Sequence, residues 1–309
     1  MAEVSVVIPV HNREHMLGPC IQSALDQTVS DLEVVIVDNA STDGTWSVCE
    51  DFARRDHRVR IFRNATNIGP VRNWQRCINV AQGKYAKILF SDDLMHPTFL
   101  ERTLPLIQNE DVGLVFTMAT IGRDPWCGQT AYKWVNGTRL VPSHAFMRAA
   151  LFGCEVPVSP GAALFRLEDL RTNLCLDIPS PTMSNFASHG AGIDLLLYLL
   201  TARTYKEVAF VDEPLVFFRA HPGSITIASD STKLRDYYTQ ARLWFASVYD
   251  KGVVLERTIA WAWLAECKTR RRIISPRAFV RRFLPSHTTG ITLSATVWAI
   301  TRRVARLLR

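Results

Sequence analysis

The chain has 309 residues, 48% of them hydrophobic and 21% charged, and a formal net charge of +7 at pH 7. This composition is that of an ordinary folded protein, and it excludes a disordered chain, a collagen-like fibre and a disulfide-stabilised miniprotein. The positive charge is concentrated in residues 251–309, which carry 13 Lys and Arg against two acids, so we expect this tail to meet a nucleic acid or an anionic membrane surface.

Strand and helix patterns alternate through the first 120 residues. Continuous apolar runs predict buried strands at Val4–Val10, Leu32–Val37, Val59–Phe62, Tyr85–Phe90 and Val112–Met118. Amphipathic spacing predicts helices between them, at about 14–28, 45–55, 70–82 and 97–109. This alternation predicts an α/β fold with a mostly parallel sheet, covered by helices on both faces and binding ligands at the carboxyl ends of its strands.

The remainder of the chain is less regular. We expect an irregular surface or lid at residues 120–140 and a loop beside the site at 177–192. Helices are predicted at Ser143–Phe152, Ile193–Arg203 and from about 232 onward, and strands at Ala162–Phe165 and Val208–Val211. The predicted organisation is a domain over 1–230, divided into halves 1–120 and 121–230, with a helical basic region over 231–309.

Two polar clusters follow the first two predicted strands. Ile8–Glu14 places hydrogen-bonding groups at the carboxyl edge of the sheet, unless it is an ordinary strand-to-helix turn. Val37–Thr45 begins with Asp38, whose carboxylate can accept the imide N–H of a uracil or thymine ring, and continues with residues suited to cap a helix. Neither cluster is a G-x-G-x-x-G or a G-x-x-x-x-G-K-[ST] motif, which argues against dinucleotide-binding and P-loop proteins.

Two further clusters contain residues suited to binding a phosphate or a metal ion. Asn67–Asn73 is a Gly-Pro turn that puts Arg72 in the first turn of a helix, within reach of a phosphate, although a simple helix start remains open. Phe90–Pro97 contains the adjacent acids Asp92 and Asp93 after a buried strand. Their hard oxygen ligands suit Mg²⁺ or Mn²⁺, which in turn hold a nucleotide diphosphate; the alternative is a helix-capping pair.

In this order and on this strand pattern, the four clusters resemble the family 2 glycosyltransferases with the GT-A fold, and among them the bacterial O-antigen and capsular polysaccharide enzymes. The matching stretches read VVIPVHNRE, VVIVDNASTDGT, NIGPVRN and GKYAKILFSDDLMHP. The likeness is close over residues 4–100 and looser to about 226.

The resemblance implies an inverting, metal-dependent glycosyltransferase that moves a sugar from a UDP- or dTDP-sugar donor to an acceptor hydroxyl. Asp92 would bind Mn²⁺ or Mg²⁺ as part of a D-x-D motif, whose first acid is replaced here by Phe90. The residues that the resemblance assigns to the donor are Pro9, His11, Asn12, Glu14, Asp38, Asn67, Arg72, Ser91 and Asp93.

The same resemblance assigns catalytic roles in the second half. Asp194 would be the general base that deprotonates the acceptor, with Asp177 and Glu155 as weaker substitutes. In the segment RAHPGS at 219–224, Arg219 would neutralise charge on the leaving group, and His221 would bind the metal or the pyrophosphate.

The end of the basic region has a helical period. One stripe of that helix is apolar and the opposite face is basic; the stripe is Leu293, Val297, Ile300, Val304 and Leu308, and the basic face is Arg302, Arg306 and Arg309. The uncharged stretch 283–301 is about long enough to span a bilayer, but polar residues dilute it, so a helix lying in the membrane interface fits better. The alternatives are a helix packed on the body and a nucleic-acid contact, which we do not expect because no aromatic-basic platform accompanies the charge.

These features together predict a cytoplasmic protein that is peripheral on the inner face of the cytoplasmic membrane, with a lipid-linked oligosaccharide as acceptor. The seven cysteines include no C-x-x-C pair, which indicates reduced thiols, and no secretory signal is visible. Two other functions remain open. One is a catalytically inactive nucleotide-sugar-binding or scaffold protein, which Phe90 permits, and the other is a nucleotidyltransferase, whose usual Gly-rich basic loop is missing.

Overall fold

The computed structural model describes residues 2–153, 156–157, 159–181, 183, 185–223, 230–287 and 291–307. Its strands are β1 (Val4–Val10), β2 (Leu32–Asp38), β3 (Val59–Arg63), β4 (Tyr85–Ile88), β5 (Leu94–Met95), β6 (Val112–Gly122), β7 (Gln129–Ala131), β8 (Arg139–Pro142), β9 (Ala163–Arg166) and β10 (Glu207–Arg219). Its helices are α1 (Glu14–Leu25), α2 (Thr45–Arg55), α3 (Pro70–Val80), α4 (Phe99–Ile107), α5 (Ser143–Leu151), α6 (Leu167–Asn173), α7 (Ile193–Thr204), α9 (Ser231–Tyr249), α10 (Val253–Arg270), α11 (Pro276–Phe283) and α12 (Leu293–Leu307). The predicted α/β fold is confirmed.

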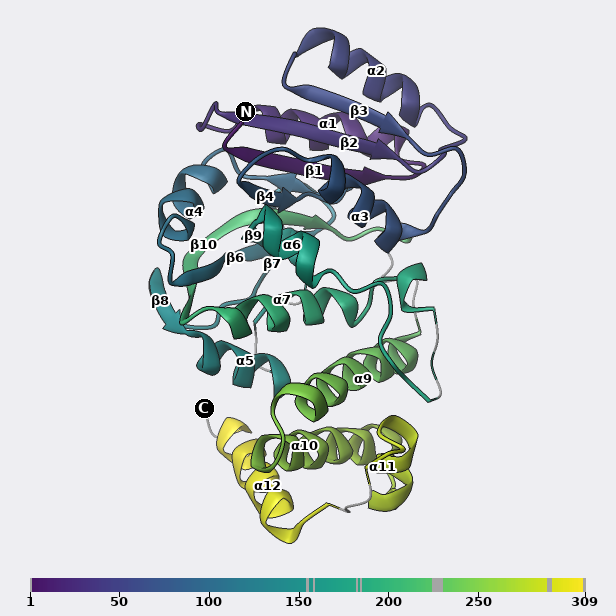
Figure 1. Cartoon of the computed structure of the whole chain (residues 1–309), viewed down its shortest axis with the longest axis vertical. Coiled ribbons are helices and arrows are strands. Elements are labelled where there is room, and N and C mark those ends of the chain that lie inside the picture. Colours follow the sequence, from purple (N-terminus) through teal and green to yellow (C-terminus); the bar gives the residue numbers. More distant parts are fainter. Residues whose placement is uncertain are drawn as a thin grey trace.

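The sheet has the strand order β3-β2-β1-β4-β9-β6-β10-β5, with β7 beside β6 and β8 beside β10. The neighbours β3, β2, β1 and β4 are parallel, and β6 is parallel to β10. Because β9 runs antiparallel to both β4 and β6, these two strands point the same way. The sheet is therefore mostly parallel, as predicted, and the ends of β1, β4, β6 and β10 lie along one edge (Figure 1).

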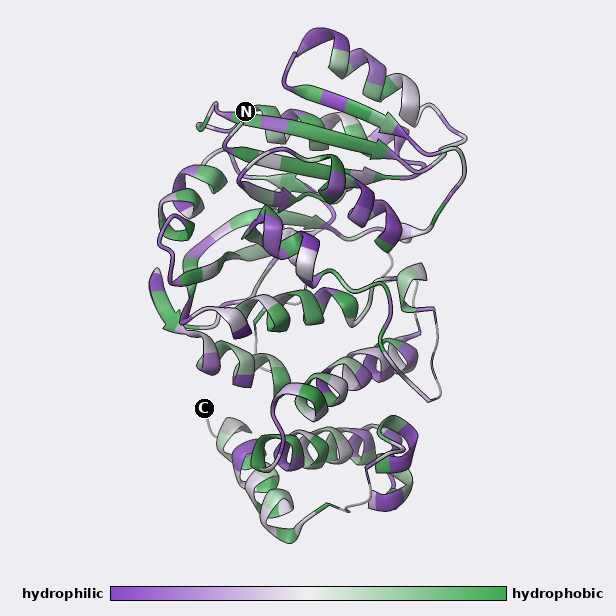
Figure 2. Cartoon of the chain, viewed as in Figure 1, coloured by the Kyte–Doolittle hydropathy of each residue, from purple (hydrophilic) through white to green (hydrophobic). Residues whose placement is uncertain are grey.

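Helices cover both faces of the sheet because the side chains of each buried strand alternate between the faces. In β1, Val6 and Ile8 belong to the core shared with α1, α2 and α4, whereas Val7 belongs to the core shared with α3, α6 and α7. Figure 2 shows the resulting pattern of apolar strands between helices of mixed hydropathy.

The strand predicted at Val208–Val211 is much longer in the structure, where β10 continues to Arg219. The register between β10 and β6 shifts on both sides of Pro214, so the strand bulges at the proline and then resumes. A proline within an acidic turn sequence conceals this continuation from pattern analysis. Its effect is to carry Arg219 to the same sheet edge as the end of β1.

The segment 120–140 is also more regular than predicted, because β6 extends to Gly122 and the short strands β7 and β8 follow. A Cβ atom on Gly122 would lie 1.8 Å from the carbonyl oxygen of Cys127, so the β6–β7 turn closes only with glycine there. The turn brings β7 back to pair antiparallel with β6, so this part of the segment belongs to the sheet.

The C-terminal helices lie farthest from the N-terminal strands in Figure 1. Residues of α9, α10 and α11, among them Leu243, Ile259 and Phe283, form a small core of their own. Other α9 residues, including Phe245, join the main core below α7. A domain boundary at residue 230 stays a prediction. No helix among the described residues is both long and apolar enough to cross a bilayer.

Helix α12 packs on α10 through two alanines and Trp298, whose ring centroid is 6.4 Å from that of Trp261, and leaves its apolar stripe exposed. Ala295 and Ala299 are buried, at 4% and 0% exposure. The stripe residues Leu293, Val297, Ile300 and Val304 are 80%, 53%, 48% and 49% exposed. Leu308 and Arg309 lie outside the described residues. The helix is thus packed on the body and amphipathic at once.

Candidate active site

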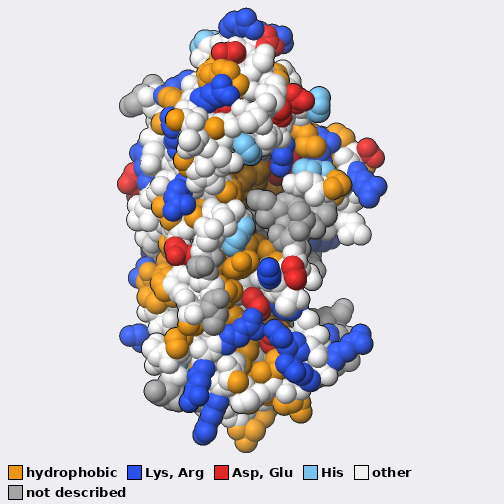
Figure 3. All heavy atoms as spheres, turned by 90° about the vertical axis from the view of Figure 1, so that its right-hand side faces the viewer, with side chains coloured by type: hydrophobic (Ala, Val, Ile, Leu, Met, Phe, Trp, Pro, Cys, Tyr) orange, Lys and Arg blue, Asp and Glu red, His pale blue; other side chains and the backbone are white. Residues whose placement is uncertain are grey.

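A cavity of about 660 Å³ opens at the carboxyl ends of β1, β4 and β10, where the sequence predicts ligand binding. Figure 3 shows a hollow on this side of the molecule with apolar atoms along its floor. Most of the predicted site residues line the cavity although they come from distant parts of the chain. They are Pro9, His11, Asn67, Ser91, Asp92, Asp93, Asp194 and Arg219.

Asp92 lies between two basic side chains at one side of the cavity. Its Oδ2 is 2.8 Å from Nε2 of His221 and 3.9 Å from Nε of Arg13. His221 itself lines a small adjoining pocket instead of the main cavity. The chain just beyond β10 thus brings His221, which the resemblance assigns to the metal or the pyrophosphate, beside Asp92.

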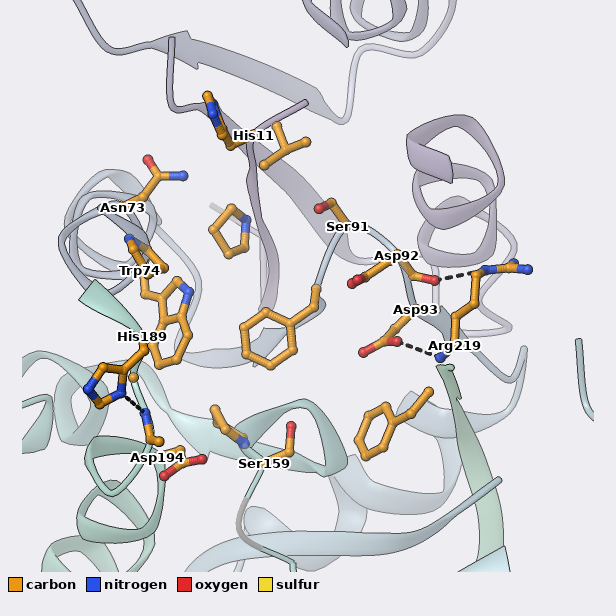
Figure 4. Close-up of a pocket in the computed structure, with 18 of the residues that line it drawn as sticks. His11, Asn73, Trp74, Ser91, Asp92, Asp93, Ser159, His189, Asp194 and Arg219 are labelled. Atoms are coloured by element: carbon orange, nitrogen blue, oxygen red, sulfur yellow. Dashed lines mark hydrogen bonds between the residues drawn. The ribbon is translucent and has the colours of Figure 1, made fainter. Parts of the chain in front are cut away.

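Asp93 points to the end of β10 and is held by it. The backbone N–H of Arg219 donates to Oδ1 of Asp93 at 3.0 Å, and Nε of Arg219 donates to the Asp92 carbonyl oxygen at 3.2 Å (Figure 4). Burial and then the nearby charge of Asp92 raise the pKa of Asp93 well above its usual range. Beneath it lies Lys87, fully buried, and burial lowers the pKa of this amine to about 7.

The residues present fit a divalent cation held mainly by its phosphate ligand. Asp92 offers a carboxylate at the cavity, and His221 offers an imidazole beside it. The described residues contain no cluster of three or more His, Cys, Asp or Glu that could hold a metal alone. Mg²⁺ is commonly bound by one or two carboxylates together with substrate phosphates and water, so two protein ligands suffice.

Phe90, which replaces the first acid of the D-x-D motif, lines the cavity as an apolar wall. Its ring centroid is 5.2 Å from that of Trp74 in α3. The pair forms a surface suited to the apolar face of a sugar or a nucleoside.

Amide side chains form a network at the end of β1 and β2. Asn39 donates to Oδ1 of Asn67 at 2.8 Å, and Nδ2 of Asn67 is 3.2 Å from Nε2 of His11. Behind them, Asn64 donates to Asn39 and to Asn73 at 2.8 and 2.9 Å. The network fixes the polar groups of His11 and Asn67 at the cavity wall, where they can recognise a base or ribose.

Asp194, at the start of α7, lies across the cavity from Asp92 (Figure 4). Backbone N–H groups of Gly192 and Leu195 donate to its Oδ1 at 2.8 and 2.7 Å, and the Tyr238 hydroxyl donates to its Oδ2 at 2.6 Å. These hydrogen bonds lower the pKa of Asp194, but burial outweighs them and raises it to about 7. A carboxylate with this proton affinity, facing a cavity, suits general base catalysis near neutral pH.

Four predicted donor residues do not line the cavity. The Asp38 carboxylate is fully buried, accepts from the Ser41 backbone N–H at 3.1 Å and lies 3.0 Å from Nε of Arg63. Its predicted contact with a base therefore has no support in the geometry. Arg72 is on the exposed face of α3, because Val71 and Trp74 take the inward positions of that helix.

The other two residues join neighbouring loops. Asn12 accepts from the Thr42 backbone N–H at 2.9 Å, and Glu14 accepts from the Gly44 backbone N–H at 2.7 Å. Both side chains line only the small adjoining pocket. Asp177 is exposed and away from the cavity, while Glu155 and residues 224–226 lie outside the described residues.

Several residues that line the cavity have no assigned site role from the sequence, although Tyr132 is an aromatic residue that could stack on a sugar or pack in the core. Tyr238 and Leu234 come from α9, beyond the predicted boundary at residue 230. Tyr132 reaches the cavity from the segment after β7, with a φ of 67° that is unusual for a tyrosine. These positions depend on the path of the chain in three dimensions, and no local motif marks them.

Comparison with known proteins places this site in context. Residues 5–173 match the family model described as glycosyl transferase family 2. Glycosyltransferase GlyG of Streptococcus pneumoniae is 32% identical over 246 residues, with 72% of each chain covered. The putative teichuronic acid biosynthesis glycosyltransferase TuaG of Bacillus subtilis is 31% identical over 152 residues, which cover 49% of this chain and 59% of TuaG.

Solved structures share the fold at low sequence identity. TarS 1–349 of Staphylococcus aureus, in complex with UDP-GlcNAc, has a TM-score of 0.69 at 15% identity and covers 92% of this chain and 82% of its own. Mannosyltransferase PcManGT of Pyrobaculum calidifontis, in complex with GDP-Man and Mn²⁺, has a TM-score of 0.54 at 18% identity and covers 99% of this chain and 80% of its own.

Proposed function

Because this chain belongs to glycosyltransferase family 2 and is a glycosyltransferase with the GT-A fold, we propose that it transfers a sugar from a UDP- or dTDP-sugar to a hydroxyl of a lipid-linked oligosaccharide, with inversion at the anomeric carbon. The observation that carries this proposal is the opposed placement of Asp92 and Asp194 across one cavity (Figure 4). A single displacement needs the leaving group and the base on opposite faces of the sugar.

The donor would lie along the cavity wall that is lined by residues from the first part of the chain, between Pro9 and Asp93. His11 and Asn67 would face its nucleoside, and Arg219 would face the diphosphate. Asp92 and His221 would hold Mn²⁺ or Mg²⁺. When bound, this cation would supply positive charge that offsets the negative charge developing on the leaving diphosphate. A uridine donor is supported by the UDP-GlcNAc bound to TarS, a protein of the same fold.

Asp194 would accept the proton of the acceptor hydroxyl as its oxygen attacks the anomeric carbon in line. Both Asp194 and the acceptor would be partly shielded from water by Tyr132 and Tyr238, which line the same part of the cavity. The bond to the leaving oxygen breaks as the new glycosidic bond forms, so no covalent enzyme intermediate is needed.

We further propose that α12 holds the protein at an anionic membrane, where a lipid-linked acceptor resides. The support is the exposed apolar stripe of α12 together with the excess of 13 Lys and Arg over two acids in residues 251–309. Figure 3 shows Lys and Arg gathered over the C-terminal part of the molecule.

The experiment that tests the donor assignment is a thermal-shift screen of UDP-, dTDP-, GDP- and CMP-sugars, each with and without Mn²⁺. A ligand that binds only the folded state raises its apparent stability. We expect a Mn²⁺-dependent shift with a uridine or thymidine nucleotide sugar. A shift with GDP- or CMP-sugars alone would overturn the donor class, and no shift with any of them would favour an inactive scaffold protein.

A further inference from the structure

We propose that Tyr238 positions the carboxylate of Asp194 for proton abstraction, so that the C-terminal helical region supplies part of the catalytic centre. This inference rests on the proposed role of Asp194 as general base. Tyr238 lies in α9, outside the residues 5–173 that match the family model. It lines the cavity next to the carboxylate that it contacts.

The hydrogen bonds of Asp194 leave little freedom for an incoming hydroxyl group. An ionised carboxylate has about four lone-pair positions. The backbone N–H groups of Gly192 and Leu195 take both positions of Oδ1, and the Tyr238 hydroxyl takes one position of Oδ2. Among the donors in the described residues, none occupies the remaining position of Oδ2. That position is where the acceptor hydroxyl would dock, and Tyr238 determines its direction.

Tyr238 is itself held in place from behind. The guanidinium carbon of Arg242, one helical turn further along α9, is 5.9 Å from the centre of the Tyr238 ring. Nε of Arg242 donates to the carbonyl oxygen of Ala150 at the end of α5, at 3.0 Å. Arg242 thereby links the Tyr238 ring to the end of α5, which limits movement of the ring away from Asp194.

The titratable and charged groups that act on Asp194 come from three elements. Tyr238 and Arg242 of α9 lower its pKa, the first by hydrogen bonding and the second by its charge. Tyr198 of α7 and Tyr132 of the segment after β7 lie near enough to feel its charge. Tyr238 is the side chain among them that donates a hydrogen bond to the carboxylate. A hydrogen bond to the charged form favours that form, so its loss leaves the base protonated at neutral pH.

The test compares Tyr238→Phe with Tyr237→Phe in the full chain. Both changes remove one hydroxyl from adjacent residues of the same helix, but Tyr237 stacks on His189, at 4.0 Å between ring centres, and makes no contact with Asp194 among the described hydrogen bonds. The Asp194 carboxyl carbon is followed by ¹³C NMR in protein labelled at aspartate Cγ and is assigned with Asp194→Asn. The rate of UDP-GlcNAc hydrolysis with Mn²⁺ is measured over the same pH range.

We expect the Tyr238→Phe titration to move upward by about one pH unit, and the acid limb of hydrolysis to move with it, which gives about tenfold less activity below the pKa and recovery at high pH. Tyr237→Phe should leave both curves in place. A Tyr238→Phe titration that coincides with the parent would overturn the inference, as would an activity loss that is equal at every pH. Undiminished hydrolysis by Asp194→Asn would instead overturn the assignment of the base.

Discussion

A methyl group on Gly192 would lie 2.9 Å from the carbonyl oxygen of Tyr237, so α7 and α9 approach each other at backbone distance beside the cavity. Gly192 caps α7 with a φ of +88°, two residues before Asp194. Tyr237 directly precedes Tyr238. The close approach therefore sets the separation between the carboxylate of Asp194 and the hydroxyl that donates to it.

Gly192→Ala should separate these groups and lower both stability and activity. Alanine at this φ costs about 1–3 kcal/mol of strain, and the added crowding pushes α9 away. The control is Gly252→Ala, because Gly252 also has a positive φ, +80°, but nothing lies within 4 Å of its missing Cβ. Urea unfolding and donor hydrolysis are measured for both. Equal losses in the two variants would show that the α7–α9 contact is unimportant.

Asp194 should make the protein less stable as pH rises toward neutrality. Its folded pKa of about 7 is above the unfolded value of about 3.9, so the native state binds the extra proton between these values. The stabilisation is full below about pH 4 and is lost as pH rises through 7. Asp194→Asn is neutral throughout and lacks this loss.

The measurement is urea unfolding of the parent and Asp194→Asn at pH 5 and pH 8. The parent should lose stability relative to the variant at the higher pH, whereas donor hydrolysis by the parent should rise over the same range as the base ionises. A stability difference that does not change with pH would contradict the raised pKa. Asp194→Asn should abolish transfer and keep the donor-induced thermal shift.

Phe90→Asp restores the acid that the D-x-D motif lacks, and we expect it to trade stability for metal affinity. Without metal, a third carboxylate beside Asp92 and Asp93 adds like-charge repulsion and removes the contact with Trp74, so the melting temperature should fall. Added Mn²⁺ should raise the melting temperature of Phe90→Asp more than that of the parent. Phe90→Asn is the uncharged control of similar size. If Mn²⁺ raises the melting temperatures of the parent and both variants equally, the metal is not bound at this position.

The α12 stripe should be required for binding to vesicles that contain phosphatidylglycerol. Val297→Asp with Ile300→Asp puts two charges on the exposed stripe, which should abolish sedimentation with these vesicles and leave the melting temperature unchanged. Ser294→Asp with Thr301→Asp adds the same charge at exposed polar positions beside the stripe and should weaken binding only slightly. If both double variants lose vesicle binding equally, the protein is held at the vesicles by charge alone and not by the apolar stripe. Deleting residues 276–309 is a poorer test because it removes Phe283 from a core.

Much of the donor side of the site could be predicted because it is local in sequence. The strand ends at His11 and Ser91 are marked by polar residues that follow buried apolar runs, and both line the cavity as expected. The exceptions follow from side-chain direction. Asp38 ends its strand but turns to Ser41 and Arg63, and Arg72 lies one position away from the inward face of its helix.

The acceptor side was harder to predict because its residues meet only through tertiary packing. Asp194 is predicted from its place at the start of an apolar helix and from the resemblance, and the structure puts it at the cavity. Its partner Tyr238 lies 44 residues further along, on a helix whose pattern indicates only packing. The continuation of β10 past Pro214 is a similar case, since pairing with β6 outweighs the local preference of proline.

The contact between Tyr238 and Asp194 affects how a shortened protein would behave at the bench. A chain cut at residue 230, where the sequence suggests a boundary, would keep the wall formed by residues 9–93 and would lose the hydroxyl that orients the base. Such a fragment would also lose Phe245 from the main core, so it would be less stable than the full chain and turn over poorly. A genuine enzyme would then be mistaken for a dead one, and the fault would lie in the choice of fragment.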